Sequence, residues 1–386
     1  MKRFSSKERD HVLRVINSES HTSMVRQLEE RFAERFDCKY AIGFVNGTAT
    51  MHAALAAAGV GPGDEVIVPP LTFASTALAV VHANAMPVFA DIDPDTWTIS
   101  PASIEAQITE RTRAIIPVSI YGLSPDMDPI MGIADRHSLF VLEDDAECFL
   151  GYYKGRLVGS IGDASSFSFE TSKHMTSGQG GMITTNDPDL ATAIRRFGAL
   201  GYGSVRGKAS EGAITKDVLQ DPFYERHVSL GWNYLLSEIC AAVALGQLER
   251  LDELVEMRIR VAAIYEQARN GCAWLIGQKV PTDSVHTYWT YVLRLERRGV
   301  TWQCFRREYI ENGGDPMYAA WLPTYMEPVF RQKTFGGGQS QRFDLGLCPI
   351  TEAIQPWLLQ FKTDYVSVSD AERQADALAR TIAHFD

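Results

Sequence analysis

The chain has 386 residues, of which 45% are hydrophobic and 22% charged, a composition typical of globular proteins and long enough for two lobes. Its net charge of −11 argues against nucleic-acid binding, because a phosphate backbone requires clustered Lys and Arg side chains. The amino terminus lacks the apolar core of a signal peptide, and no apolar run reaches the ~20 residues of a membrane helix. We therefore expect a cytoplasmic protein with neither a membrane nor a nucleic acid as partner.

The first half of the chain alternates short apolar runs with segments of helical length. The apolar runs cover residues 41–45, 65–68, 87–90, 114–118 and 139–142, and further strand-like runs follow at 164–169 and 181–184. Near-continuous apolar strands separated by helices are typical of a mostly parallel sheet that is buried on both faces. The sequence therefore predicts an α/β fold with a mostly parallel central sheet flanked by helices, and a helix over 51–58 after the first strand.

The second half has a different pattern. A segment rich in Ala, Leu, Glu and Arg predicts one long helix over 236–267. A β-like run at 286–295 and a helix at 302–312 follow, and a last helix is expected at 369–385, where Ser369-Asp370-Ala371-Glu372 has the form of a capping box. We predict a large domain over 1–250 and a smaller C-terminal α+β domain over 251–386.

The six cysteines are widely scattered and form no Cys-x-x-Cys pair. Such pairs are the usual sequence sign of a zinc site or a redox dithiol. We therefore expect free thiols and no metal site.

Polar residues that follow apolar strands mark the candidate site, because ligands bind beyond the carboxyl ends of parallel strands. The first group is Asn46-Gly47-Thr48-Ala49, where a glycine turn leads into a helix. The free N–H groups of a helix start and the Thr48 hydroxyl could hold a phosphate. The alternative is a simple helix cap.

The second group is the acidic run that follows the strand at 139–142. It reads Glu143-Asp144-Asp145-Ala146-Glu147. A carboxylate at this edge could face a protonated pyridine nitrogen, as pyridoxal 5'-phosphate (PLP) requires in order to accept electrons. The alternative is an acid that caps a helix.

The third group is the segment from Ser166 to Lys173. Ser168 could bind a phosphate through its hydroxyl, and Lys173 could react as an amine with an aldehyde of the same cofactor. Phe73, after Pro69-Pro70, could stack on a flat ring. Taken alone, Lys173 fits a solvated surface residue and Phe73 a core residue.

Together and in this order, the motifs resemble those of the DegT/DnrJ/StrS sugar aminotransferases, which belong to the fold-type I PLP-dependent transferases. The resemblance runs from Val45 to Tyr365. It is carried by Gly47-Thr48, Pro69-Pro70-Leu71-Thr72-Phe73, Glu143-Asp144-Asp145-Ala146-Glu147, Ser166-Phe167-Ser168-Phe169-Glu170-Thr171-Ser172-Lys173, Gly180-Gly181 and Gly231-Trp232-Asn233-Tyr234.

The resemblance implies a role for each matching residue. Lys173 would carry PLP as a Schiff base and act as the catalytic base, and Asp144 would pair with the pyridinium nitrogen. Glu147 would lie near the phenolic oxygen, and Phe73 would stack on the ring.

The resemblance also implies a phosphate site and a dimer. Gly47, Thr48, the Ala49 backbone and Ser168 would hold the phosphate, while Asn233 would reach the phosphate of a partner subunit. That arrangement implies a homodimer with shared active sites.

Two positions depart from the family pattern and remove a charge near the expected site. Leu235 stands where relatives usually have arginine, and Gln179 stands where many have glutamate. Loss of the arginine could alter carboxylate recognition, or the position could be structural.

The implied activity is transfer of an amino group, with L-glutamate as donor, to a keto or aldehyde sugar for a cell-surface glycan such as lipopolysaccharide or for an antibiotic. The acceptor could be nucleotide-linked, or a sugar acid, since residues 312–321 resemble the branch that forms 8-amino-3,8-dideoxy-octulosonate. Tyr318 and Trp321 could stack on a sugar, although the sequence favours a core position for both.

Two other functions fit the same scaffold. Dehydratases of this type have histidine where this chain has Lys173, so the lysine favours amino transfer. A regulator that binds a sugar or cofactor without catalysis is disfavoured because Lys173, Asp144 and Ser168 are all present.

Overall fold

The structure is a computed structural model that describes residues 3–19, 22–211, 214–331 and 343–386. Its centre is a seven-stranded sheet in which only β9 runs antiparallel to its neighbours. In spatial order the strands are β1 (Tyr40–Phe44), β9 (Gly181–Thr185), β8 (Ala164–Ser168), β5 (Phe140–Asp144), β4 (Thr112–Ile115), β2 (Glu65–Val68) and β3 (Met86–Phe89). The predicted mostly parallel sheet is confirmed.

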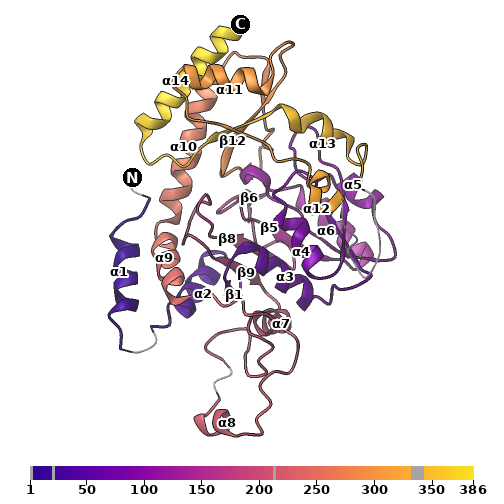
Figure 1. Ribbon diagram of the computed structural model, residues 1–386, viewed down its shortest axis with the longest axis vertical. Helices are drawn as coiled ribbons and strands as arrows, with labels where there is room; N and C mark the ends of the chain where they lie inside the picture. Colours follow the sequence, from indigo (N-terminus) through magenta and orange to yellow (C-terminus); the bar gives the residue numbers. More distant parts are fainter. Residues whose placement is uncertain (1–2, 20–21, 212–213, 332–342) are drawn as a thin grey trace.

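Helices bury both faces of this sheet (Figure 1). On β2, Val66 and Val68 pack into the core formed with α3 and α4, whereas Ile67 packs into the core formed with α5 and α6. Alternate residues of one strand therefore face two hydrophobic cores, which explains its continuous apolar sequence. The helices of this part are α1 (Ser6–Ile16), α2 (Met24–Arg35), α3 (Gly47–Ala57), α4 (Ser75–His82), α5 (Pro101–Ala106), α6 (Met127–His137), α7 (Pro188–Gly198), α8 (Lys216–Gln220) and α9 (Glu238–Leu248).

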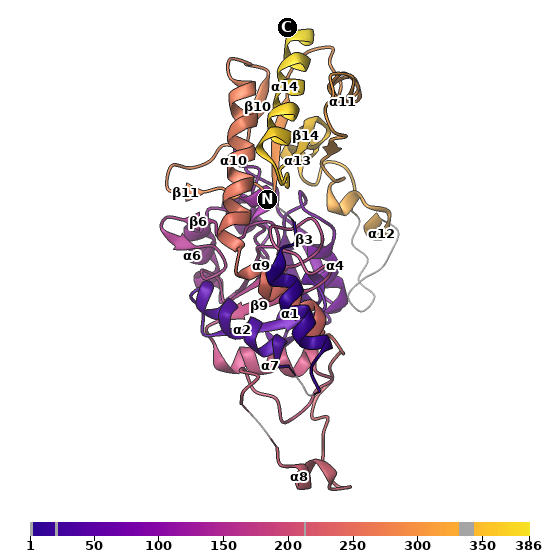
Figure 2. The same cartoon turned by 90° about the vertical axis from the view of Figure 1, so that its left-hand side faces the viewer.

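A second, antiparallel sheet of four strands lies at the end of the molecule opposite α8 (Figures 1 and 2). Its strands, in spatial order, are β10 (Leu275–Gly277), β12 (Thr290–Leu295), β14 (Leu358–Lys362) and β13 (Tyr318–Ala319). Apolar side chains of α10 (Leu251–Arg269), α11 (Trp302–Glu311) and α14 (Val368–Phe385) complete its core.

The remaining elements are short. They are β6 (Tyr152–Tyr153), β7 (Arg156–Leu157) and β11 (Ser284–Val285), which form a small third sheet, the helices α12 (Pro328–Arg331) and α13 (Pro349–Ile354), and the 3₁₀ turns η1 (Ile120–Gly122), η2 (Thr324–Met326) and η3 (Gln355–Trp357).

The single long helix predicted over 236–267 is wrong. The chain leaves the helical conformation at Arg250, whose φ of −125° and ψ of 11° separate α9 from α10. The Arg250 guanidinium forms a buried ion pair with Glu8 of α1 at 3.0 Å, a tertiary contact that helical periodicity does not reveal. The predicted domain boundary between residues 250 and 251 falls at this break and stays a prediction.

Three other boundaries differ from the predictions. The run at 286–295 is interrupted, because residues 286–289 link β11 to β12 and Tyr288 has a φ of 49°. The last helix begins at Val368, and the capping box expected at Ser369 is absent: that hydroxyl instead pairs with the Ser367 hydroxyl at 2.6 Å. The helix expected at 51–58 begins at Gly47.

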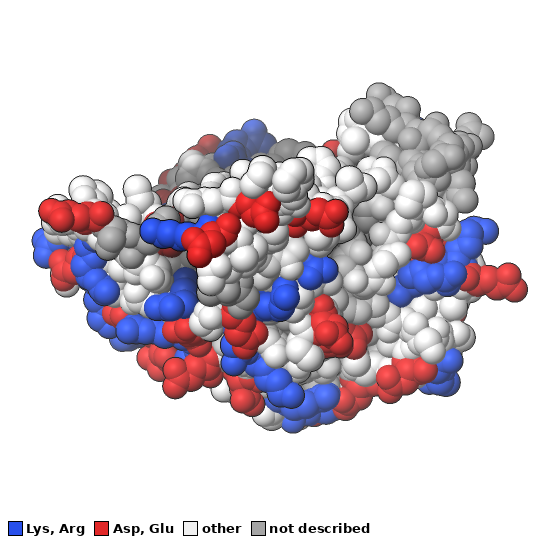
Figure 3. All heavy atoms as spheres, turned by 90° about the horizontal axis from the view of Figure 1, so that it is seen from below, with Lys and Arg blue, Asp and Glu red and all other residues white. Residues whose placement is uncertain are grey.

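Within the described residues, no helix combines the length and apolar character needed to cross a membrane. The same residues contain no group of three or more His, Cys, Asp or Glu side chains placed to hold a metal ion. All six cysteines are free. On the face shown in Figure 3, Lys and Arg side chains are interleaved with Asp and Glu.

Candidate active site

Three predicted site segments meet at one edge of the large sheet. Asp144 is the last residue of β5, and Ser168 is the last residue of the neighbouring strand β8. Gly47 begins α3, three residues after the end of β1. Because β1, β5 and β8 point in the same direction, their carboxyl ends bring these residues to the same edge.

The acidic run that begins in β5 and continues past its end divides into two pairs with different surroundings. Glu143 is buried and accepts hydrogen bonds from the backbone N–H groups of Gly159, Ile161 and Gly162, at 2.7 to 3.3 Å. Asp145 is buried between two serine hydroxyls. These two acids are structural, which leaves Asp144 and Glu147 for chemistry.

Asp144 is buried, and its carboxylate is held by two donors. Thr76 Oγ1 donates a hydrogen bond to Oδ2 at 2.8 Å, and the Ala146 N–H donates to Oδ1 at 3.3 Å. Burial raises the pKa of Asp144, while the Thr76 hydroxyl and the Lys173 ammonium oppose that rise. Thr76 therefore favours the charged form of a carboxylate that has little access to water.

Lys173 is held beside Glu147. Its Nζ donates a hydrogen bond to Glu147 Oε1 at 3.2 Å, and the Tyr121 backbone N–H donates to Oε2 at 3.0 Å. Burial raises the pKa of Glu147, and the ammonium of Lys173 counteracts it. The same ammonium lies 4.4 Å from the centre of the Trp289 ring. Lys173 is thus a largely buried amine between an acid and an aromatic face.

The start of α3 lies against the end of β8. A Cβ atom on Gly47 would lie 3.0 Å from Ser168 Cβ and 3.5 Å from its hydroxyl oxygen, so glycine permits this close approach. The N–H groups of Gly47 and Thr48 occupy the first helical turn, where no intrahelical acceptor exists. The Ala49 N–H, in contrast, donates to the Asn46 side chain at 2.8 Å. Asn46 therefore caps this helix, and the predicted use of the Ala49 N–H competes with that cap.

Phe73 lies in the loop between β2 and α4 rather than in the core. Its side chain is 55% exposed, and its ring packs edge-on against Trp321 at 5.5 Å. Trp321 in turn stacks on Trp289 at 5.7 Å. A row of three aromatic rings therefore leads from Phe73 to the ring beneath the Lys173 ammonium.

The DegT/DnrJ/EryC1/StrS aminotransferase family model matches residues 3–356 of this chain. The chain belongs to this family. As a PLP-dependent aminotransferase, it needs a buried carboxylate, an amine and a phosphate site at one edge of the sheet.

Individual relatives agree with this assignment. The aminotransferase is 41% identical over 304 residues to GDP-perosamine synthase of Caulobacter vibrioides, and the match covers 76% of each chain. It is 39% identical over 318 residues to the spore coat polysaccharide biosynthesis protein SpsC of Bacillus subtilis, covering 81% of this chain and 79% of that protein. The X-ray structure of the aminotransferase from Psychrobacter cryohalolentis matches with a TM-score of 0.87 and 30% identity over 99% of this chain and 98% of that one. The predicted family, fold and cofactor are confirmed.

The residues of this aminotransferase fit PLP. Gly47 and Ser168 approach closely beside two N–H groups in the first turn of α3, where a phosphate would be held, and Phe73 presents an exposed ring. Asp144 and Lys173 supply the carboxylate and the amine from neighbouring segments. Sequence reasoning missed Thr76 and Trp289. Thr76 was detectable as a hydroxyl residue in the first turn of the helix after Phe73.

A cavity of about 600 Å³ opens beside this cluster and is partly lined by Ser172, Trp289, Tyr318 and Trp321. Tyr318 is 73% exposed, so the expectation that it belongs to the core is wrong. Both residues of β13, Tyr318 and Ala319, are exposed and line the cavity. A volume of this size is typical of small-molecule sites.

Asn233 is not part of this cluster in its own chain. It is exposed and forms an isolated bridge with Ala199, and no hydrogen bond within the described chain joins it to Lys173 or Glu147. The two departures from the family pattern, Leu235 and Gln179, are exposed as well.

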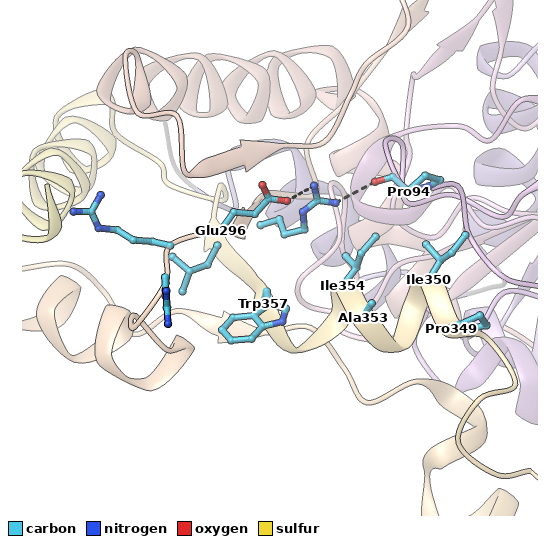
Figure 4. A pocket seen from close by; sticks show the side chains of 11 residues that line it. Pro94, Glu296, Pro349, Ile350, Ala353, Ile354 and Trp357 are labelled. Carbon is cyan, nitrogen blue, oxygen red and sulfur yellow. Dashed lines mark hydrogen bonds and ion pairs between the residues drawn. The ribbon is translucent and has the colours of Figure 1, made fainter.

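Another hollow, of about 700 Å³, lies between Pro94, the end of β12 and α13 (Figure 4). Its lining combines apolar residues such as Ile350 and Trp357 with Arg294 of β12 and the two arginines that follow this strand. Arg294 is already paired with Glu296. None of the predicted site residues lines it. The Lys173 cluster is therefore the candidate active site.

Proposed function

We propose that this aminotransferase transfers an amino group from L-glutamate to a keto or aldehyde sugar, with Lys173 binding PLP covalently through its amine. The observation that carries the proposal is the buried contact between the Lys173 ammonium and Glu147, in a cluster that includes Asp144. A lysine in such a site is a candidate nucleophile rather than a solvated surface residue.

Each polar side chain then has a chemical task. When bound, PLP supplies a conjugated ring that accepts the electron pair of a breaking C–H bond. Asp144 keeps a negative charge where a protonated ring nitrogen would lie, and Thr76 holds that carboxylate in place. Lys173, when its amine is free, moves the proton from the α-carbon of the donor. Glu147 orients the amine between these steps.

The phosphate and the ring have separate supports. Gly47 and Thr48 offer backbone N–H groups at the positive end of α3, and Ser168 adds a hydroxyl. Ala49 contributes only if the Asn46 cap opens. Phe73 covers one face of the ring.

The cavity at Trp289, Tyr318 and Trp321 is the proposed acceptor site. Aromatic faces pack against the C–H faces of sugars, and the nearby Asp315, Gln360 and Lys362 offer hydrogen-bonding groups. The acceptor is proposed to be a nucleotide-linked keto-deoxysugar or an octulosonate-type sugar acid, destined for lipopolysaccharide, another cell-surface glycan or an antibiotic.

A homodimer with shared sites, in the cytoplasm, completes the proposal. The segment from Leu200 to Ile239 exposes an unusual number of large apolar side chains, and such surface is typical of subunit contacts. The exposed residues are Leu200, Val218, Leu219, Phe223, Val228, Leu230, Trp232, Leu235 and Ile239. Leu235, in place of arginine, adds to this apolar surface, and Asn233 lies within the same segment.

The test is to locate the cofactor and follow its turnover. Borohydride reduction of the holoenzyme should fix the cofactor on Lys173, as identified by peptide mass spectrometry. L-glutamate should bleach the visible band of the holoenzyme, and the true acceptor, found in a panel of keto and aldehyde sugars, should restore it.

Other outcomes would identify another function. Attachment at another lysine, or full activity of Lys173→Ala with saturating PLP, would refute the proposal. Colour that persists with every amino donor would indicate a non-catalytic binder, and loss of water from a keto sugar without amine transfer would indicate a dehydratase. Lys279→Ala, at an exposed residue paired with Asp95, is the control.

A further inference from the structure

Arg258 is a buried cation whose hydrogen bonds join separate parts of the fold. It lies on α10, the helix that extends from beside the large sheet to the small sheet (Figure 1). Its side chain is 5% exposed. All four recorded acceptors of its terminal nitrogens are neutral oxygens, and among the described residues it forms no ion pair with a carboxylate.

Two of these acceptors belong to the Lys173 turn. Arg258 Nη2 donates to the carbonyl oxygen of Ser172 at 2.7 Å and to that of Lys173 at 3.0 Å. The same carbonyl of Ser172 also accepts a hydrogen bond from Trp289 Nε1 at 3.1 Å. The backbone of the turn is therefore fixed directly before and at the reactive lysine.

The other two acceptors belong to the small sheet. Arg258 Nη1 donates to the carbonyl oxygen of Trp289 at 2.7 Å and to the hydroxyl of Thr363 at 3.1 Å. Trp289 directly precedes β12, and Thr363 directly follows β14. One guanidinium thus ties the turn that contains Lys173 to the residues that directly flank β12 and β14.

Burying a cation without a carboxylate partner costs free energy. The N–H donors of such a cation must therefore form well-placed hydrogen bonds with other acceptors. Burial lowers the pKa of Arg258 to about 10, with Asp364 and Glu147 opposing the decrease at longer range, and the group stays protonated at neutral pH. Only a planar guanidinium presents parallel donors to two pairs of acceptors. A lysine ammonium at this depth cannot reach both pairs.

We propose that Arg258 is a positioning residue that locks the Lys173 backbone to Trp289 and thereby sets where the Lys173 amine lies relative to Glu147. The inference rests on the proposed function of Lys173. Arg258 also lines the cavity assigned to the acceptor. Because carbonyl and hydroxyl oxygens of the protein already accept hydrogen bonds from both of its terminal nitrogens, we assign it no role in binding a substrate carboxylate. Its effect on the reaction passes through the lysine.

The decisive variants are Arg258→Lys, which keeps the charge, and Arg258→Ala. We expect Arg258→Lys to lower the rate of the glutamate half-reaction about 100-fold, as for a displaced catalytic group, with KM changed by less than about threefold. Added guanidinium ion should restore activity to Arg258→Ala, whereas methylammonium should not. Arg260→Lys and Arg260→Ala, at an exposed arginine of the same helix, should match the parent.

A readout without cofactor separates positioning from general damage. In the apoenzyme, acetylation of Lys173 relative to the exposed Lys279 is measured by peptide mass spectrometry. We expect the rate of Lys173 acetylation, relative to that of Lys279, to rise severalfold in Arg258→Lys. The melting temperature of the apoenzyme should stay close to that of the parent. If Arg258→Ala does not fold, the Arg258→Lys variant still tests the positioning role.

The inference and the proposed function can fail separately. If borohydride fixes the cofactor on Lys173 in the parent but the Arg258 variants behave like the Arg260 variants, the positioning role is refuted. A rate loss that merely follows the unfolded fraction refutes it as well. If the parent shows no attachment at Lys173, the proposed function itself is refuted.

Discussion

The Thr76 hydroxyl donates a 2.8 Å hydrogen bond to the Asp144 carboxylate, and both side chains are buried. The pair joins the first turn of α4 to the last residue of β5. The hydrogen bond therefore fixes the orientation of the carboxylate at the edge where the strands end, and it favours the charged form of that carboxylate.

Thr76→Val should move the acidic limb of activity to higher pH. Burial raises the pKa of Asp144 and the Thr76 hydroxyl lowers it, so loss of the hydroxyl leaves a higher pKa. Activity that needs the charged form is then lost earlier as the pH falls. We expect a shift of about one pH unit in the profile of kcat/KM, for a hydrogen bond to a charged group. An unchanged limb would show that Asp144 does not govern the profile. Thr96→Val, at a half-buried threonine in the loop between β3 and α5, is the control.

His286 should make stability depend on pH. Its Nδ1 accepts a hydrogen bond from the Tyr288 N–H at 2.9 Å, so the folded state requires a neutral ring, and burial lowers the pKa of His286 from 6.5 to about 3. A depressed pKa contributes stability above pH 6.5 that is lost as the pH falls toward 3, because the unfolded chain binds the proton first.

Between pH 6.5 and 4, we expect the parent to lose about 3 kcal/mol more free energy of unfolding than His286→Gln. Urea unfolding at several pH values measures the difference. The same substitution at the exposed His384 should leave the slope as in the parent. Equal slopes for the parent and His286→Gln would contradict the prediction.

Trp321→Ala should weaken binding of the sugar acceptor and leave the reaction with the amino donor unchanged. Its ring stacks on Trp289 and lines the 600 Å³ cavity, which we assign to the sugar. Loss of one aromatic contact is worth about 1 kcal/mol, so KM for the sugar should rise by about fivefold. Bleaching by L-glutamate, followed by stopped flow, should stay within twofold to threefold, about the scatter of such effects. Trp357→Ala, in the hollow of Figure 4, should change neither value. Equal loss in both half-reactions would place Trp321 elsewhere in the mechanism.

Lys173→Ala and Asn233→Ala should complement each other when mixed. If Asn233 acts on the site of its partner, a mixed dimer has one site with both residues intact and one site with neither. Activity should then reappear after subunit exchange, although each variant alone is weak. Denaturation and refolding of the mixture, followed by the activity assay, measures this. Absence of recovery, with exchange verified by native mass spectrometry, would place Asn233 in the site of its own chain.

Leu230→Asp tests the contact surface itself. Leu230 is 92% exposed in the chain, and a charge there would be buried without a partner if the surface is covered. We expect the dissociation constant of the dimer, measured by sedimentation, to rise at least about tenfold. Leu345→Asp, at a 73% exposed leucine outside the Leu200–Ile239 segment, is the control. A dimer of unchanged stability would exclude Leu230 from the interface.

The sequence alone determined the order and type of the main elements and the edge of the sheet at which the candidate site residues lie. Continuous apolar strands such as 65–68 can only be buried on both faces, and polar residues directly after them must lie at one edge. Local order along the chain also made Lys173, Asp144 and Ser168 candidates, because strand ends and helix starts are local features, and the family resemblance gave each of them a predicted role.

Only the tertiary structure decided what depends on distant contacts. The Arg250–Glu8 ion pair lies where two helices meet that the sequence pattern predicts as one. The Ala49 N–H, which the motif assigns to a phosphate, donates its hydrogen bond to Asn46 instead. The partners of the acids at the end of β5 and the four hydrogen bonds of Arg258 likewise join segments far apart in the chain. Such contacts are set by packing and burial, which composition and spacing do not encode.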